Sequence, residues 1–144
     1  VYKRQAEELV PPFENPAFRL YFDPPWENLG GSLAGASGAP RLFGSGSPKP
    51  GNELAVDLYD AQPSAAGFLV AGFVPLDPPL PVLGGTLIPF PQIFLPVTAN
   101  VDGELEVPFT WLSVMQDLYV QLWMVDATAP EGFSATDTLH VFAQ

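Results

Sequence analysis

The sequence predicts an all-β protein folded as an antiparallel β-sandwich of about seven strands, and three observations lead to this prediction. The 144 residues include 18 prolines and 13 glycines, which separate short apolar runs and show no collagen-like period. Several of these runs alternate apolar and polar side chains with the period of two that is typical of strands. No run of helical periodicity alternates with them, which argues against an α/β fold. Turn signals about every ten residues fit an immunoglobulin-like or jelly-roll-like sandwich.

The first part of the chain is expected to lie outside the main sandwich. Residues 1–28 hold five prolines among large aromatic side chains, and are predicted to be a fragment of an upstream region or an extended arm. Residues 29–50 are rich in Gly, Ser and Pro, and are predicted to be a linker that contains the first short strand, near Arg41. Deleting residues 1–25 is expected to change the stability by less than about 1 kcal/mol. Trp26 is expected to fold back onto the sandwich.

Residues 51–144 are expected to form the sandwich itself. The segment 52–59 alternates cleanly, which places its leucine and valine side chains on the inner face. The apolar run 67–74 is typical of a strand that is covered on both faces. Seven prolines in 75–96 leave room only for short edge strands. The stretch 111–117 is helix-like for one turn at most.

The second half of this region adds a hairpin and two strong strands. The Asp-Gly pair at 102–103 favours a tight turn, after which 105–107 alternates. Residues 118–125 are apolar except for Gln121, and the last strand is expected within 136–142. These strands predict a core made of Leu54, Val56, Leu58, Phe68, Val70, Leu105, Val107, Val120, Leu122, Leu139 and Val141.

Charge is unevenly distributed along the chain. The formal net charge is −11, and the region from Gly51 to Gln144 holds eleven carboxylates but no Lys or Arg. Such a surface repels phosphate groups, so nucleic acids and anionic membranes are not expected as partners.

Salt screens the repulsion among the carboxylates. We therefore expect the melting temperature, followed by circular dichroism, to rise with added sodium chloride; a flat salt response would contradict this expectation.

The chain has no cysteine. The absence of cysteine excludes disulfides, thiol catalysis and cysteine-based zinc sites. It does not exclude a secreted protein, because a domain of this size can fold on its core alone. The richest apolar stretch, 68–95, is interrupted by six prolines and does not predict a membrane span. The first five residues, from Val1 to Gln5, resemble the translated sequencing adapter found in metagenomic gene fragments. These five residues are then not native, and the true N-terminus is expected to be missing.

Candidate catalytic groups are few. His140 is the one histidine and has no serine near it in sequence, so we interpret it as a partly exposed strand residue rather than part of a Ser-His-Asp triad. Glu104 and Glu106 lie on one strand face about 7 Å apart. That spacing falls between the ranges of retaining and inverting glycosidases, and we interpret the pair as a solvated face. The sequence thus predicts no enzyme, no catalytic residue and no cofactor.

Two ligand-binding alternatives remain open. Asp126 follows a central strand and Asp137 precedes the last one, so a structural calcium site is one alternative, although no compact string of ligands is present. Tyr59, Tyr119 and Trp123 are candidate ligand-binding residues, because exposed aromatic rings on one face would stack on sugar rings. Packing in the core is the competing interpretation of the same three aromatics.

A resemblance covers the chain from Trp26 onward. It rests on stretches that occur in a recognisable order and spacing, namely LGGSLAG at 29–35, GGTLIPFP at 84–91, QLWMVD at 121–126, and then Pro130 and Gly132. In these stretches the chain resembles an uncharacterised family of C-terminal β-sandwich domains from large secreted proteins of planctomycetes and related marine bacteria. At 136–137 it has Thr-Asp where the family usually has Ser-Asn. The resemblance implies a secreted module that follows other extracellular domains, and it implies no activity.

These observations lead to rival functions. The first is a non-catalytic extracellular structural or interaction module at the C-terminal end of a secreted bacterial protein. Its expected place is outside the cell or at the cell surface, as a monomer without membrane insertion. Its expected partners are other domains of the same protein, polysaccharide or cell-surface components. The alternative is a carbohydrate-binding module attached to a secreted enzyme, and a third reading is a fragment whose catalytic domain lies upstream.

Overall fold

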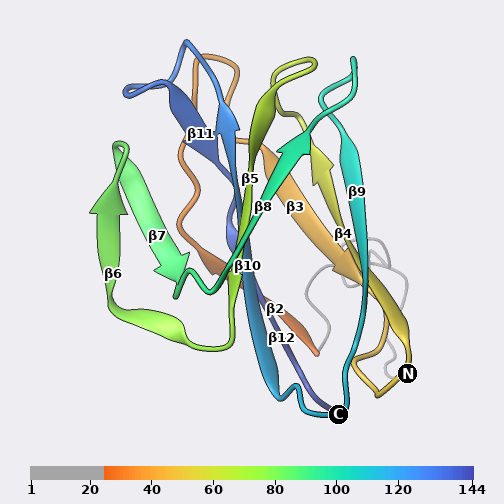
Figure 1. Cartoon of the computed structure of the whole chain (residues 1–144). Helices are drawn as coiled ribbons and strands as arrows, with labels where there is room; N and C mark the ends of the chain where they lie inside the picture. The colour runs from red at the N-terminus through yellow and green to blue at the C-terminus, as the bar shows by residue number, and fades with distance from the viewer. Residues whose placement is uncertain (1–24) are drawn as a thin grey trace, which may run out of the picture.

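The computed structural model describes residues 25–144, and it confirms the all-β prediction. These residues form eleven strands and no helix, so the described part contains no helix long and apolar enough to cross a membrane. The number of strands exceeds the expected seven, in part because the proline-rich stretch 75–98, where only short edge strands were expected, forms three strands, one of them eight residues long. Figure 1 shows how the strands are arranged.

The larger of the two facing sheets has six antiparallel strands. Five of them lie in the order β2 (Trp26–Gly30), β12 (Thr138–Phe142), β10 (Asp117–Val125), β5 (Ala66–Gly72) and β8 (Ile93–Thr98). The sixth, β11 (Phe133–Ala135), pairs with the end of β10. The strand order therefore places the C-terminal strands β10 and β12 in the middle of the sheet.

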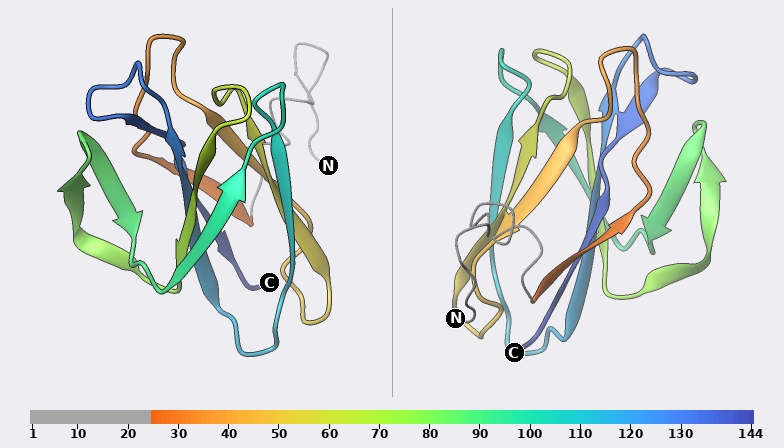
Figure 2. Two further views of the ribbon diagram at one scale, coloured as in Figure 1. Left: turned by 45° about the horizontal axis from the view of Figure 1, so that its top comes forward. Right: turned by 180° about the vertical axis from the view of Figure 1, so that it is seen from behind.

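Two further units lie on opposite sides of this sheet. The smaller sheet has three strands, in the order β3 (Arg41–Ser45), β4 (Glu53–Tyr59) and β9 (Leu105–Thr110). A separate hairpin is made of β6 (Pro75–Val82) and β7 (Gly85–Pro89). The larger sheet lies between the hairpin and the smaller sheet, as both views in Figure 2 show. The sandwich thus carries an additional hairpin on its outer face.

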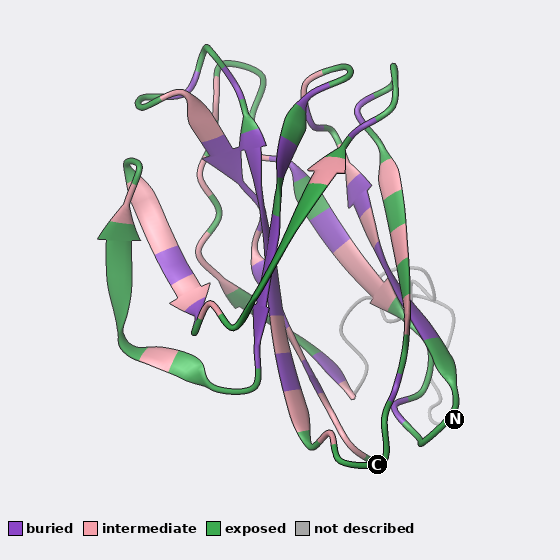
Figure 3. Cartoon of the chain, in the orientation of Figure 1, coloured by how far each residue is buried: buried purple, intermediate pink, exposed green. Residues whose placement is uncertain are grey.

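The main core fills the space between the two sheets. Leu118, Val120, Leu122 and Met124 alternate along β10 and are all buried there. Most of the predicted core is confirmed, with Leu105 and Val107 partly buried at its margin. Buried residues appear in Figure 3 as a purple band along the central strands. The structure adds Leu42, Leu69, Trp111 and others to the core.

One predicted core residue is wrong, and the strand register explains why. Phe68 is 41% exposed, because it lies opposite Trp123 on the outer face of the larger sheet. Leu69 is its neighbour on β5 and points inward to the main core. Val70 is buried as predicted, but it packs under the hairpin and not between the sheets. A strand that is apolar on both faces does not reveal which face is inner.

The hairpin covers a second, smaller core. Val70, Leu87, Trp123 and Ala135 are buried in it, with Leu33 and other partly buried residues around them. This cover explains why β5 and β10 are apolar on both faces, as the sequence predicted. Strands that face solvent on one side would instead alternate apolar and polar residues.

A buried glutamine connects the hairpin to the sheet. The Gln121 amide nitrogen lies 3.2, 3.1 and 3.2 Å from the carbonyl oxygens of Gly31, Thr86 and Thr136. Its Oε1 accepts the backbone N–H of Ile88 at 3.4 Å. Gln121 is fully buried, so its amide replaces water as the partner of these backbone groups.

Gln121→Leu is therefore expected to destabilise the fold by about 1–3 kcal/mol, because buried carbonyl groups lose their donor. Urea denaturation measures this change, and hydrogen exchange at the Ile88 amide should accelerate. Gln92→Leu is the matched control. The Gln92 side chain accepts the Phe73 N–H at 2.7 Å in an exposed position, so its loss should cost less than about 1 kcal/mol. Equal effects of the two substitutions would argue against a structural role for Gln121.

Of the two expected boundaries, the one at residue 28 falls inside β2, whose Trp26 is paired with Val141 in the larger sheet. The one at residue 50 lies in the turn between β3 and β4. The short strand predicted near Arg41 is β3, which pairs with β4 over its full length. Glycine in this stretch serves packing: a Cβ atom at Gly44 would collide with the Trp26 ring. The expectation that Trp26 folds back onto the sandwich is confirmed, while residues 1–24 lie outside the described part.

Candidate functional site

The three aromatic residues predicted to bind a ligand do not share one surface. Trp123 is 4% exposed and lies beneath the hairpin. Tyr59 is at the end of β4 in the smaller sheet, where its ring packs against Phe43 with centroids 5.7 Å apart. Tyr119 is on the outer face of the larger sheet. The structure therefore does not assemble a sugar-stacking platform from these three rings.

Tyr119 belongs to a cluster around His140. The two rings are stacked with centroids 4.2 Å apart and almost parallel planes. His140 Nδ1 lies 2.6 Å from Glu27 Oε1, and its Nε2 lies 2.7 Å from Asp117 Oδ1. A neutral imidazole has only one N–H, so donation to both carboxylates requires the charged imidazolium.

This cluster connects three neighbouring strands. Glu27 comes from β2, His140 from β12 and Asp117 from β10, so the contacts run across the sheet. Burial, and then the charges of Asp117 and Glu27, raise the pKa of Tyr119 above its ordinary value of 10.0. Glu27, His140 and Asp117 thus form an ion-pair cluster that connects the three strands. Both ring nitrogens of His140 face carboxylates and neither faces a serine, so the Ser-His-Asp interpretation gains nothing from this cluster.

The acidic pair considered from the sequence lies on the outer face of the smaller sheet. Glu104 and Glu106 are both exposed. Glu106 is directly opposite Asp57 on the neighbouring strand. Burial, and then the charge of Glu106, raise the pKa of Asp57 above its ordinary value of 3.8. The folded chain therefore holds the Asp57 proton more tightly than the unfolded chain does.

Because the pKa of Asp57 is raised in the folded chain, the ionised carboxylate is less favourable there than in the unfolded chain. The free energy of unfolding therefore falls as the pH rises through the titration of Asp57, and the full loss is present at neutral pH. Asp57→Asn is accordingly expected to raise the free energy of unfolding at pH 7 by about 0.2–1 kcal/mol, the usual size of a cross-strand charge effect. Thermal melting as a function of pH measures it. The gain should vanish below the ordinary pKa of 3.8, where both states are protonated. Asp102→Asn, in an exposed turn, is the control, and an equal gain there would contradict the pairing argument.

The two aspartates considered as calcium ligands have other roles. The Asp126 Oδ1 accepts the backbone N–H and the hydroxyl of Thr128, at 2.9 and 2.6 Å. The Asp137 Oδ2 accepts the Asn28 side-chain amide at 2.9 Å. Within residues 25–144, no group of three His, Cys, Asp or Glu side chains is placed to hold a metal ion. Both carboxylates accept hydrogen bonds within the chain, from Thr128 and from Asn28.

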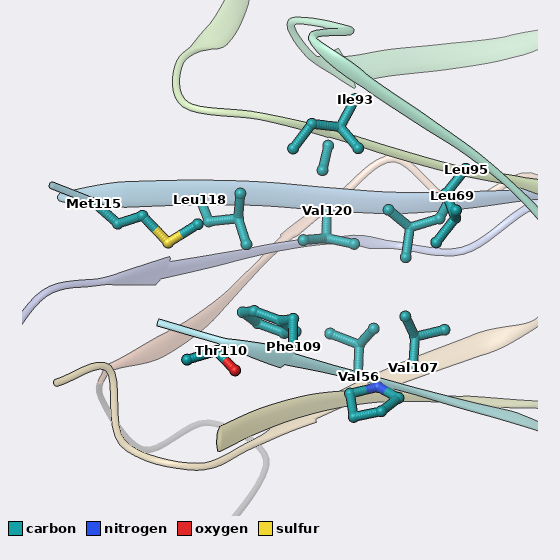
Figure 4. A pocket seen from close by; sticks show the side chains of 12 residues that line it. Val56, Leu69, Ile93, Leu95, Val107, Phe109, Thr110, Met115, Leu118 and Val120 are labelled. Atoms are coloured by element: carbon teal, nitrogen blue, oxygen red, sulfur yellow. The ribbon is translucent and has the colours of Figure 1, made fainter. Parts of the chain in front are cut away.

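An apolar opening lies between the edges of the two sheets. An opening of about 180 Å³ leads from solvent between β8 and β9 to the main core. Figure 4 shows Ile93 and Leu95 on one wall, and Val107 and Phe109 on the opposite wall. Of the twelve described residues that line it, only Thr110 has a polar side chain. The opening therefore offers apolar contact with little competition from polar groups.

Both strands beside this opening carry a proline. Pro96 lies in β8 and Pro108 in β9, and each of these strands has only one neighbour in its sheet. Proline has no N–H, and in sheets it is confined to edges where no donor is required. The free edges therefore lack a continuous row of donors for an added strand. A partner can instead make contact by inserting a side chain into the opening.

The sequence analysis did not identify this opening. The signal was present as the apolar segment 93–97 and the alternating segment 105–109, each of which contains a proline that marks an edge strand. Nothing local indicates that these two edges face each other across the core. That relation depends on which sheet each strand joins.

Comparison with known proteins gives no relative. No family model matches the chain, and neither the curated proteins nor the solved structures contain a significant match. The resemblance to secreted planctomycete domains therefore rests on the sequence stretches alone and stays a prediction.

Proposed function

We propose that this chain is a non-catalytic extracellular interaction module of a secreted bacterial protein, and that it holds another domain of the same protein at the opening between β8 and β9. The observation that carries the proposal is the apolar opening itself, with a volume of about 180 Å³ and a rim of exposed apolar residues. Ile93 and Leu95 are exposed in β8 and also line it. Exposed apolar surface of this kind marks contact sites.

The charge of the domain defines the chemistry of the partner. Residues 51–144 carry eleven carboxylates and no Lys or Arg, so this region has a strongly negative charge. A partner with further carboxylates would be repelled, whereas an apolar side chain flanked by neutral or basic residues would be accepted. The edge prolines favour a contact through side chains over addition of a strand.

The test needs the complete reading frame of the parent protein. Its upstream part, made as a separate polypeptide, is titrated with this chain in a calorimeter. Ile93→Glu at the rim is expected to weaken the association at least about tenfold, because it places a charge in an apolar contact. Val101→Glu, in an exposed turn outside the opening, is the matched control and should leave the affinity unchanged. The proposal fails if the two polypeptides do not associate, or if Ile93→Glu binds as well as the native chain.

The carbohydrate-binding alternative finds less support. It relied on three aromatics, of which Trp123 is buried and Tyr59 belongs to the other sheet. A glycan array separates the two functions. Binding to a polysaccharide that Tyr119→Ala abolishes would favour the alternative, and absence of glycan binding agrees with the interaction module.

A further inference from the structure

A second apolar hollow lies on the other side of the larger sheet, beneath the tip of the β6–β7 hairpin. Its volume is about 190 Å³, and the residues that line it are all apolar or aromatic. Phe68, Phe94 and Trp123 come from the sheet, while Leu83 comes from the hairpin tip. The Phe68 and Phe94 rings meet edge to face, with centroids 5.9 Å apart. Figure 2 shows the hairpin on the side away from the smaller sheet, so this hollow is separate from the opening described above.

The hairpin tip holds Leu83 in an unfavourable conformation. Leu83 has φ of 51° and is followed by Gly84 with φ of 81°. Turns with two positive φ angles favour Asn-Gly, because a branched side chain is strained in the left-handed region. Leu83 nonetheless occupies this position, and its side chain is exposed while it lines the hollow. Backbone strain of this kind is concentrated at ligand-contacting sites.

Trp123 provides an independent observation. Its indole N–H is buried, and it has no acceptor among the residues that the structure describes. A buried tryptophan N–H usually has a partner, and an unpaired donor is costly. No other lining side chain of the hollow carries a polar group that would compete for an incoming acceptor.

We propose that this hollow binds a small uncharged ring compound that carries one acceptor oxygen, which takes the Trp123 N–H. The volume of about 190 Å³ exceeds the ~150 Å³ cavity that holds benzene, and it is smaller than the ~300 Å³ of the smallest drug-sized pockets. One ring with a short substituent therefore fits. The apolar lining excludes a charged ligand, and the negative charge of the protein opposes an anion in particular. Because the N–H is buried, side chains that line the hollow must move for the ligand to reach it.

Three probes of similar size test the proposal on the full ¹⁵N-labelled chain. Acetophenone has a ring and a carbonyl oxygen, ethylbenzene has nearly the same shape without an acceptor, and benzoate is charged. At millimolar concentration, acetophenone is expected to shift the Trp123 indole N–H resonance downfield. Trp26 is the internal control, because its N–H already donates to the Gly46 carbonyl at 3.0 Å. Ethylbenzene should bind about tenfold more weakly, and benzoate should not bind.

Two variants distinguish the proposal from simple apolar adsorption. Trp123→Phe identifies the Trp123 resonance by its loss, and it should remove the preference for acetophenone over ethylbenzene. Leu83→Asn should relieve the strained turn and raise the melting temperature, while it weakens the binding of both compounds. The proposal is overturned if acetophenone leaves the Trp123 resonance unchanged. It is also overturned if native protein binds both compounds equally, or if Trp123→Phe keeps the preference.

Discussion

Val120→Asp is expected to unfold this protein. Val120 is 2% exposed in the middle of β10, where it lies between Leu139 of β12 and Ala71 of β5. An aspartate there places an unpaired carboxylate in the main core, which costs several kcal/mol against a total stability of about 5–15 kcal/mol. Circular dichroism should show an unfolded chain, or a melting temperature lower by at least about 15 °C.

The same substitution at an exposed valine provides the matched control. Val114 is 82% exposed, so Val114→Asp should change the free energy of unfolding by no more than about 0.5 kcal/mol. Added salt should not rescue Val120→Asp, because its cost comes from burial and not from repulsion along the surface. An unchanged melting temperature for Val120→Asp would refute the inward orientation of this strand face.

Trp26→Ala is expected to cost about 3–5 kcal/mol, the usual loss for a large aromatic side chain removed from a core. The Trp26 ring closes the edge of the sandwich between β2 and β3, where it packs against Gly44. Its Nε1–H also donates to the Gly46 carbonyl at 3.0 Å. The substitution would therefore open a cavity and leave this carbonyl without its donor. Urea denaturation measures the loss.

Three comparisons make this prediction specific. Trp26→Phe keeps most of the ring and should lose distinctly less stability than Trp26→Ala. Gly44→Ala should itself destabilise, because the added Cβ atom takes the space of the Trp26 ring. Deletion of residues 1–25 should cost less than about 1 kcal/mol. A deletion that costs more than Trp26→Ala would show that the N-terminal arm belongs to the core.

The sequence alone determined the fold class and the course of the best strands. Alternation is a local property, because successive side chains in a strand point to opposite faces whatever the partner strand is. The inward positions Leu54, Val56 and Leu58 of β4 were therefore predictable. So was the cover on both faces of β5, because a strand open to solvent would not be apolar on both sides.

The tertiary structure alone decided which strands meet, and therefore what their side chains do. Phe68 and Leu69 are equally apolar, and only the position of the two neighbouring layers places Phe68 outside and Leu69 inside. Glu27 and His140 are 113 residues apart and meet because β2 pairs with β12.

Both candidate binding sites have the same origin. The opening lies where the edges of two sheets face each other, and the hollow lies where a hairpin folds over Trp123. Pairing between distant strands is set by the packing of the whole chain, because each short segment is compatible with many partners and with either face. The alternation of apolar and polar residues describes each strand by itself, so it contains no information on which strands pair or face each other.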